Sequence, residues 1–156
     1  MKNLVVFYSR TGNSKNIAIL TARKLDADLD EIISLKNYSG VLGFIKAGHD
    51  ALKNKTVPIK FLKKVKDYDI VVIISPNWGG KMASPVFSYI KLNDLKEKIL
   101  CICCVQGSSG GEKVIEQMEE CIGKRAKNSL IFNKADFKEH RYIEMINNFV
   151  KGLKLI

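Results

Sequence analysis

The sequence predicts an α/β fold in which one domain, residues 1–156, is built on a doubly wound parallel sheet. Segments typical of strands and segments typical of helices alternate about five times along the chain. The strand segments are continuous apolar runs, which indicates strands that are buried on both faces. A chain of this length can bury one sizeable core but is short for two.

The first half of the chain contains two strands and two helices. The run at 4–8, "LVVFY", predicts a buried strand, and Ile17, Leu20 and Leu25 then recur at helical spacing. Residues 28–35 alternate in character, which suits a second strand near the edge of the sheet. Residues 39–55 follow as a helix that glycines interrupt, so its ends are poorly defined.

The second half repeats the pattern three times. The clearest strand of the chain, "IVVII" at 70–74, is β-branched throughout and stops at Pro76, and the helix after it has a proline in its first turn. The remaining segments are helix 84–92, strand 98–106, helix 110–126 ending near Gly123, strand 127–135 and helix 138–156.

Three of the four cysteines lie in the apolar run "KILCICCVQ". Alternation along a strand sends Cys103 and Cys104 to opposite faces, so they do not converge on one metal ion. The run is typical of a buried strand in a reducing compartment, and we expect no metal site. The two histidines, His49 and His140, are isolated and are expected on surfaces or helices.

The composition also excludes several classes of protein. No apolar run approaches the ~18 residues of a membrane span, and the first apolar stretch ends at Arg10 without a cleavage site, which predicts a cytoplasmic protein. The formal charge of +10 raises nucleic acid or an acidic partner as a ligand. Lysine and arginine are spread evenly, without a basic tail or aromatic residues between them, so a solvated basic surface is favoured over a nucleic-acid site.

A polar stretch, Ser9-Arg10-Thr11-Gly12-Asn13-Ser14, joins the first strand to the first helix. The unpaired amides of a helix N-terminus converge there, which favours an anion. The fingerprints of triphosphate and dinucleotide sites are absent, whereas three hydroxyls and a glycine suit a single phosphate. The simpler alternative is that Asn13 or Ser14 only caps the helix.

Three loop sequences, "SRTGNS", "SPNWGGKMASPV" and "QGSSGG", follow the first, third and fourth predicted strands. Together they resemble the loops of the flavodoxin family. The first matches the phosphate loop of that family, the second resembles its flavin-contacting stretch, and the third stands where its second flavin loop lies. The resemblance covers nearly the whole chain. It implies a five-stranded sheet in the order 2-1-3-4-5 and FMN as the cofactor.

The resemblance also implies which residues bind FMN. Trp78 is expected to stack on the flavin ring or edge it, although it could instead be a half-buried structural residue, and Lys81 is the cation expected nearest the ring. The implied residues are Ser9, Arg10, Thr11, Gly12, Asn13 and Ser14 at the phosphate, Pro76, Asn77, Trp78, Gly79 and Lys81 along the ring, and Gln106, Gly107, Ser108 and Gly110 at its pyrimidine end.

The sequence departs from the family in two ways. "QGSSGG" has no aromatic residue, which leaves one flavin face open or covered by Tyr38, by Phe44 or by another subunit, and the chain is basic where classical members are acidic. The leading prediction is an electron carrier between redox partner proteins, with the charge favouring acidic ones. The alternatives are an FMN-dependent NAD(P)H:quinone-type reductase and a binding module without flavin, so an enzymatic role is left open, as is the oligomeric state.

Overall fold

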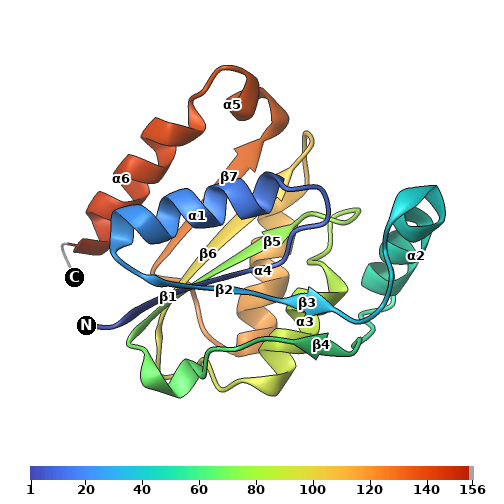
Figure 1. Ribbon diagram of the computed structural model, residues 1–156, viewed down its shortest axis with the longest axis horizontal. Helices are drawn as coiled ribbons and strands as arrows, with labels where there is room; N and C mark the ends of the chain where they lie inside the picture. The colour runs from blue at the N-terminus through green and yellow to red at the C-terminus, as the bar shows by residue number, and fades with distance from the viewer. Residues whose placement is uncertain (155–156) are drawn as a thin grey trace.

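Five parallel strands form the central sheet of the computed structural model, which describes residues 1–154. Their order is β2-β1-β5-β6-β7, so the predicted order 2-1-3-4-5 is confirmed (Figure 1). The runs predicted to be buried are the central strands, because each is covered on both faces. The strands are β1 Asn3–Phe7, β2 Asp28–Glu31, β5 Ile70–Pro76, β6 Ile99–Gln106 and β7 Asn128–Asn133.

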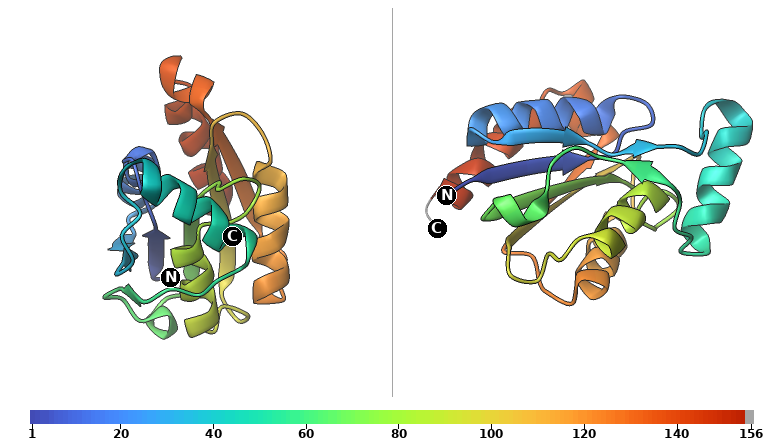
Figure 2. Two further views of the ribbon diagram at one scale, coloured as in Figure 1. Left: turned by 90° about the vertical axis from the view of Figure 1, so that its right-hand side faces the viewer. Right: turned by 60° about the horizontal axis from the view of Figure 1, so that its bottom comes forward.

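Helices cover both faces of this sheet. α1 (Asn13–Leu25) and α6 (Tyr142–Lys154) lie together on one face, and α3 (Ser84–Leu92) and α4 (Gly111–Ile122) lie on the other (Figures 1 and 2). Proline in the first turn of α3 and Gly123 in a left-handed conformation after α4 agree with the sequence analysis. The shorter elements are β3 Ile33–Ser34, α2 Gly40–Leu52, β4 Ile59–Lys60, the 3-10 turn η1 Val65–Asp67 and α5 Lys134–Lys138.

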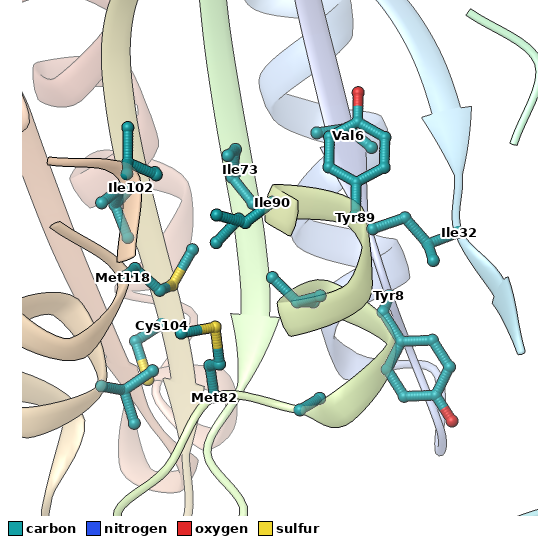
Figure 3. Close-up of a cluster of buried hydrophobic side chains, with 14 of the residues drawn as sticks. Val6, Tyr8, Ile32, Ile73, Met82, Tyr89, Ile90, Ile102, Cys104 and Met118 are labelled. Carbon is teal, nitrogen blue, oxygen red and sulfur yellow. The ribbon is translucent and has the colours of Figure 1, made fainter. Parts of the chain in front are cut away.

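The sheet separates two apolar clusters. Figure 3 shows Val6, Ile73 and Ile102 on neighbouring strands facing Ile90 of α3 and Met118 of α4. The second cluster lies under α1 and α6. Strand β6 contributes to both clusters, with Cys104 in the first and Cys101 and Cys103 in the second, and all four cysteines are free. The expected opposite orientation of neighbouring cysteines is therefore confirmed.

The predicted second strand is divided in the structure. β2 ends at Glu31, and the chain then leaves the main sheet so that β3 pairs antiparallel with β4. The buried carboxylate of Asp30 accepts hydrogen bonds from the backbone amides of Leu62 and Lys63, which brings the segment after β4 against β2. A bond between residues so far apart in sequence leaves no local signal.

The C-terminal helix also begins later than predicted, at Tyr142 instead of residue 138. Asn133 and Asp136 form a capping box that starts the short helix α5, and His140 then adopts a left-handed conformation with a φ of 55°. That conformation breaks the helical path. Within residues 1–154, no helix is long and apolar enough to cross a bilayer.

The packing of α2 against Tyr38 predicts that substituting two glycines of that helix changes the stability in opposite directions. A Cβ on Gly43 would lie 2.1 Å from the carbonyl carbon of Tyr38, whereas one on Gly48 meets nothing within 4 Å. We expect Gly43→Ala to lower the free energy of unfolding by roughly 1 to 3 kcal/mol or more. Gly48→Ala should raise it by about 0.5 to 1 kcal/mol, because alanine favours the helix. Urea unfolding of both variants checks this, and equal effects would show that α2 is not seated on Tyr38.

Candidate functional site

A cavity of about 300 Å³ opens where the carboxyl ends of β1, β5 and β6 meet. In parallel α/β sheets this edge is the usual place for a ligand, because loops from neighbouring strands converge there. The lining comes from the ends of β5 and β6, from the loops after the three strands, from the first turn of α1, and from residues of α2 and α5. The lining residues are Ser9, Arg10, Thr11, Asn13, Ser14, Phe44, Pro76, Asn77, Trp78, Val105, Gln106, Gly107, Lys134 and Phe137.

The N-terminus of α1 forms one end of this cavity. Gly12 is the N-cap residue, with a φ of 101°, and its amide donates to Ser9 Oγ over 3.0 Å. The amides of Asn13, Ser14 and Lys15 have no acceptor within the described part of the chain, and no acidic side chain lies in the first turn. The alternative in which Asn13 or Ser14 caps the helix is therefore wrong. Uncapped amides at the positive end of the helix dipole favour an anion.

Two side-chain amides hold the other loops together. Asn77 Nδ2 donates to the carbonyl oxygen of Ser109 over 2.8 Å and to Gln106 Oε1 over 3.3 Å, and Asn77 Oδ1 accepts from Gly80 N over 2.7 Å. Gln106 Nε2 donates in turn to Asn133 Oδ1 over 2.8 Å. These amides were predicted as ligand contacts, yet most of their hydrogen-bonding capacity is used within the protein. They fix the loops after β5 and β6 relative to each other.

Trp78 lines the cavity but belongs mainly to the core. Its side chain is only 8% exposed, and the rings of Tyr8 and Tyr38 pack edge-on against it at centroid distances of 5.5 and 5.1 Å. Burial raises the pKa of Tyr8 to about 12, so this phenol stays neutral. The structural alternative for Trp78 is thus largely correct, although part of the residue still reaches the cavity.

Behind Trp78 lies a buried carboxylate on α2. Asp50 is 1% exposed and accepts a hydrogen bond from Tyr38 Oη over 2.8 Å, while Lys36 and Lys55 pair with it. Burial alone would raise the pKa of Asp50, but the hydrogen bonds from Lys36 and Tyr38 outweigh it and hold the pKa at about 2. Asp50 therefore stays charged and ties α2 to the aromatic wall of the cavity.

Of the two cations predicted near the ligand, Arg10 lines the cavity and Lys81 does not. The charge of Lys81 bears instead on Cys121 of α4, where burial raises the pKa of the thiol and nearby lysines oppose that change. Arg10 and Lys134 line the cavity. The guanidinium of Arg10 lies 5.2 Å from the centroid of the Phe44 ring, so its side chain is directed toward α2.

Ten of the fifteen predicted binding residues line the cavity, and their role in binding stays a prediction. Gly12 and Gly110 are instead the N-cap residues of α1 and α4, in left-handed conformations that account for glycine there. The predicted residues outside the lining are Gly12, Gly79, Lys81, Ser108 and Gly110.

Four lining residues were not among the predicted binding residues: Phe44, Val105, Lys134 and Phe137. Phe44 was considered only as a cover, whereas Tyr38 lies buried behind Trp78. Lys134 and Phe137 follow β7, the neighbour of β6, so their place at this edge was implied by the strand order. The signal was available in the topology and not in a motif.

The structure is similar to solved structures of flavoproteins. A flavoprotein from Lactobacillus acidophilus in complex with FMN is 18% identical, with a TM-score of 0.72 over 88% of this chain and 97% of that one. A protein of Bacteroides uniformis with a provisional flavoprotein assignment is 20% identical, with a TM-score of 0.78 over 96% and 97% of the two chains. Oxidised flavodoxin 2 from Bacillus cereus is 19% identical, with a TM-score of 0.63 over 97% of each chain.

No model of a protein family matches the sequence, and no curated protein matches it. At 18 to 20% identity, the solved structures show that the chain shares their fold.

The buried carboxylate predicts a loss of stability in acid. Because the pKa of Asp50 is lowered from 3.8 to about 2, its contribution is complete above about pH 4 and is lost as the pH falls toward 2. At ~1.4 kcal/mol per unit this amounts to roughly 2 kcal/mol. Between about pH 5 and about pH 2.5 we expect wild type to lose roughly 1.5 kcal/mol more than Asp50→Asn in urea unfolding, because part of the contribution remains at pH 2.5. Equal losses would show that Asp50 titrates alike in the folded and unfolded chains.

Proposed function

The chain has the flavodoxin-like fold, and we propose that it binds FMN in the cavity at the carboxyl ends of β1, β5 and β6. The observation that carries the proposal is the uncapped N-terminus of α1, whose free amides face a loop of three hydroxyls at the end of the cavity. This arrangement suits a phosphate, and the solved flavoprotein from Lactobacillus acidophilus contains FMN.

The phosphate end fits a phosphomonoester in both donors and charge. The amides of Asn13, Ser14 and Lys15 and the hydroxyls of Thr11 and Ser14 would donate to the phosphate oxygens. Ser9 Oγ accepts from Gly12, but its own hydrogen remains available as a donor. No Asp or Glu lines the cavity in the described part of the chain, so an anion meets no like charge there.

The remainder of the cavity fits an aromatic ring. Trp78 and Val105 form its inner wall, and Phe44 and Phe137 line it from α2 and α5. The volume of about 300 Å³ is at the lower end of the range for small-molecule sites. Phe44 replaces the aromatic residue that the loop "QGSSGG" lacks as a candidate cover for the ring.

We further propose that the protein is an electron carrier. FMN, when bound, supplies the redox chemistry, and the chain binds and orients it and controls access to it. The described lining contains no His, Cys, Asp or Glu side chain, and of the side chains that commonly move substrate protons only Lys134 lines it. This supports electron transfer over catalysis on a bound substrate.

The cysteines and the net charge suggest the compartment and the partner proteins of such a carrier. All four cysteines are free, three of them buried in β6, as is typical of a reducing compartment, and we propose a cytoplasmic location. The formal charge of +10 supports acidic redox partner proteins over basic ones.

The second candidate is an FMN-dependent NAD(P)H:quinone-type reductase. It is favoured by the loop after β6, which has no aromatic residue to cover the ring from that side. Steady-state oxidation of NAD(P)H by the purified protein separates the two functions, because a carrier needs an added reductase. A chain that binds no FMN at all would be a module of this fold without flavin.

The phosphate loop predicts a loss of affinity that depends on the phosphate. Thr11→Ala combined with Ser14→Ala should weaken FMN much more than riboflavin, because both hydroxyls are assigned to the phosphate. Each hydrogen bond lost to a charged group should cost ~1.5 to 3 kcal/mol. Quenching of flavin fluorescence measures both affinities. Ser129→Ala on β7 removes an exposed hydroxyl and is the matched control. Equal losses for the two ligands would show that the loop does not hold the phosphate.

The cations of the cavity predict a difference in redox potential. Lys134→Gln should lower the midpoint potential of bound FMN, because a positive charge eases the addition of an electron. For an exposed charge ~8 Å away at an effective dielectric of ~40 to 80, the shift is about 20 to 45 mV per electron. Lys81→Gln removes the same charge outside the lining and is expected to shift it by a few millivolts only. Redox titration of both variants at low salt measures the two shifts. Equal shifts for Lys134→Gln and Lys81→Gln would contradict the role of Lys134.

A further inference from the structure

Helix α2 is amphipathic in the direction opposite to that of an ordinary surface helix. The residues it buries against the body are Gly43, Ala47, Asp50 and Ala51, three of them small and one charged. A helix that covers a core normally turns its large apolar side chains inward. The packing of α2 therefore gives no reason for the large apolar residues that it carries.

Those residues point into solvent and form what we call the α2 patch. They are Val41 at 78% exposed, Leu42 at 74%, Phe44 at 63%, Ile45 at 61% and Leu52 at 63%. Single exposed apolar residues are common, but five on one helix of thirteen residues are unusual. α2 lies at the margin of the molecule (Figure 2), and the exposed fractions of these residues show that its outer face is open.

The described charges next to the α2 patch are mainly positive. Lys46 lies exposed on α2, and the C-cap residue Lys53 is exposed directly after it. The one carboxylate of α2, Asp50, is buried and already paired with Lys36 and Lys55. An apolar centre with a charged margin has the anatomy of a protein interface, here one that is basic at its rim.

The α2 patch is continuous with the cavity. Phe44 belongs to both, and the guanidinium of Arg10 lies over its ring between them. A molecule that covers the α2 patch therefore also reaches the rim of the cavity. The occupant of the α2 patch must therefore suit an apolar surface, a basic margin and the rim of the cavity.

We propose that the α2 patch docks an acidic electron-transfer protein, an inference that rests on the proposed function. A second copy of this chain would bring two basic rims together, which opposes association. An anionic bilayer would satisfy the charge, but it would cover the rim of the cavity and offer no redox group. A protein with acidic residues around an apolar centre satisfies all three features.

The test uses the FMN-loaded protein and two probes of opposite charge. Isothermal titration with an acidic [2Fe–2S] ferredoxin is expected to show binding that weakens with salt, whereas a basic c-type cytochrome is expected not to bind. Val41→Ser combined with Ile45→Ser should weaken ferredoxin binding roughly tenfold, as for loss of apolar anchors. Leu92→Ser on α3 exposes a serine in place of an equally exposed leucine and should leave binding unchanged.

Three results would overturn the proposal. They are absence of ferredoxin binding, equal effects of the α2 and α3 variants, and stronger binding to vesicles of anionic phosphatidylglycerol than to ferredoxin. Self-association that the α2 variant abolishes would assign the patch to a second copy instead. The titration is repeated on protein without FMN. A chain that binds no FMN but still binds ferredoxin through α2 would refute the proposed function and keep the docking surface.

Discussion

The register of the three central strands is the constraint on which the rest of this structure depends. Phe7 pairs with Ile74 and Ile74 with Cys103, so β1, β5 and β6 end at one edge and release their loops side by side. A shift of one residue would turn every side chain of a strand to the other face, and both faces are buried here. The register is therefore held by the two cores, and the cavity follows from it.

Once the loops are adjacent, polar groups at that edge take one of two roles. The side-chain amides of Asn77 and Gln106 form hydrogen bonds with each other and with neighbouring loops, and these bonds fix the inner part of the cavity. At the start of α1 the amides of Asn13 and Ser14 have no partner within residues 1–154. A backbone donor that is removed from water without an acceptor raises the free energy of the folded state, so this end of the cavity suits water or an anion. Rigid walls beside free donors are what a preorganised binding site requires.

Charge is distributed over the molecule with an asymmetry that composition alone conceals. Lysine and arginine are even along the sequence, but the only carboxylate between residues 32 and 66 is Asp50, which is withdrawn into the core. Asp50 links Lys36 to Tyr38, and Tyr38 packs on Trp78. One buried charge thus joins α2 to the cavity wall and leaves the outer surface of α2 basic and apolar.

The sequence by itself determined the fold class, the strand order through the family resemblance, and the polar loop that opens α1, because each depends on local pattern: apolar runs, helical spacing and loop composition. The strand order also implied that Lys134 and Phe137, which follow β7, reach this edge. The sequence could not determine the role of Trp78, the direction of Lys81 or the place of Phe44 at the cavity. Those depend on which side of a turn a side chain takes and on segments far apart in the chain, such as β2 with residues 62 and 63. Packing between distant segments decided these side-chain positions, and no local sequence pattern encodes such packing.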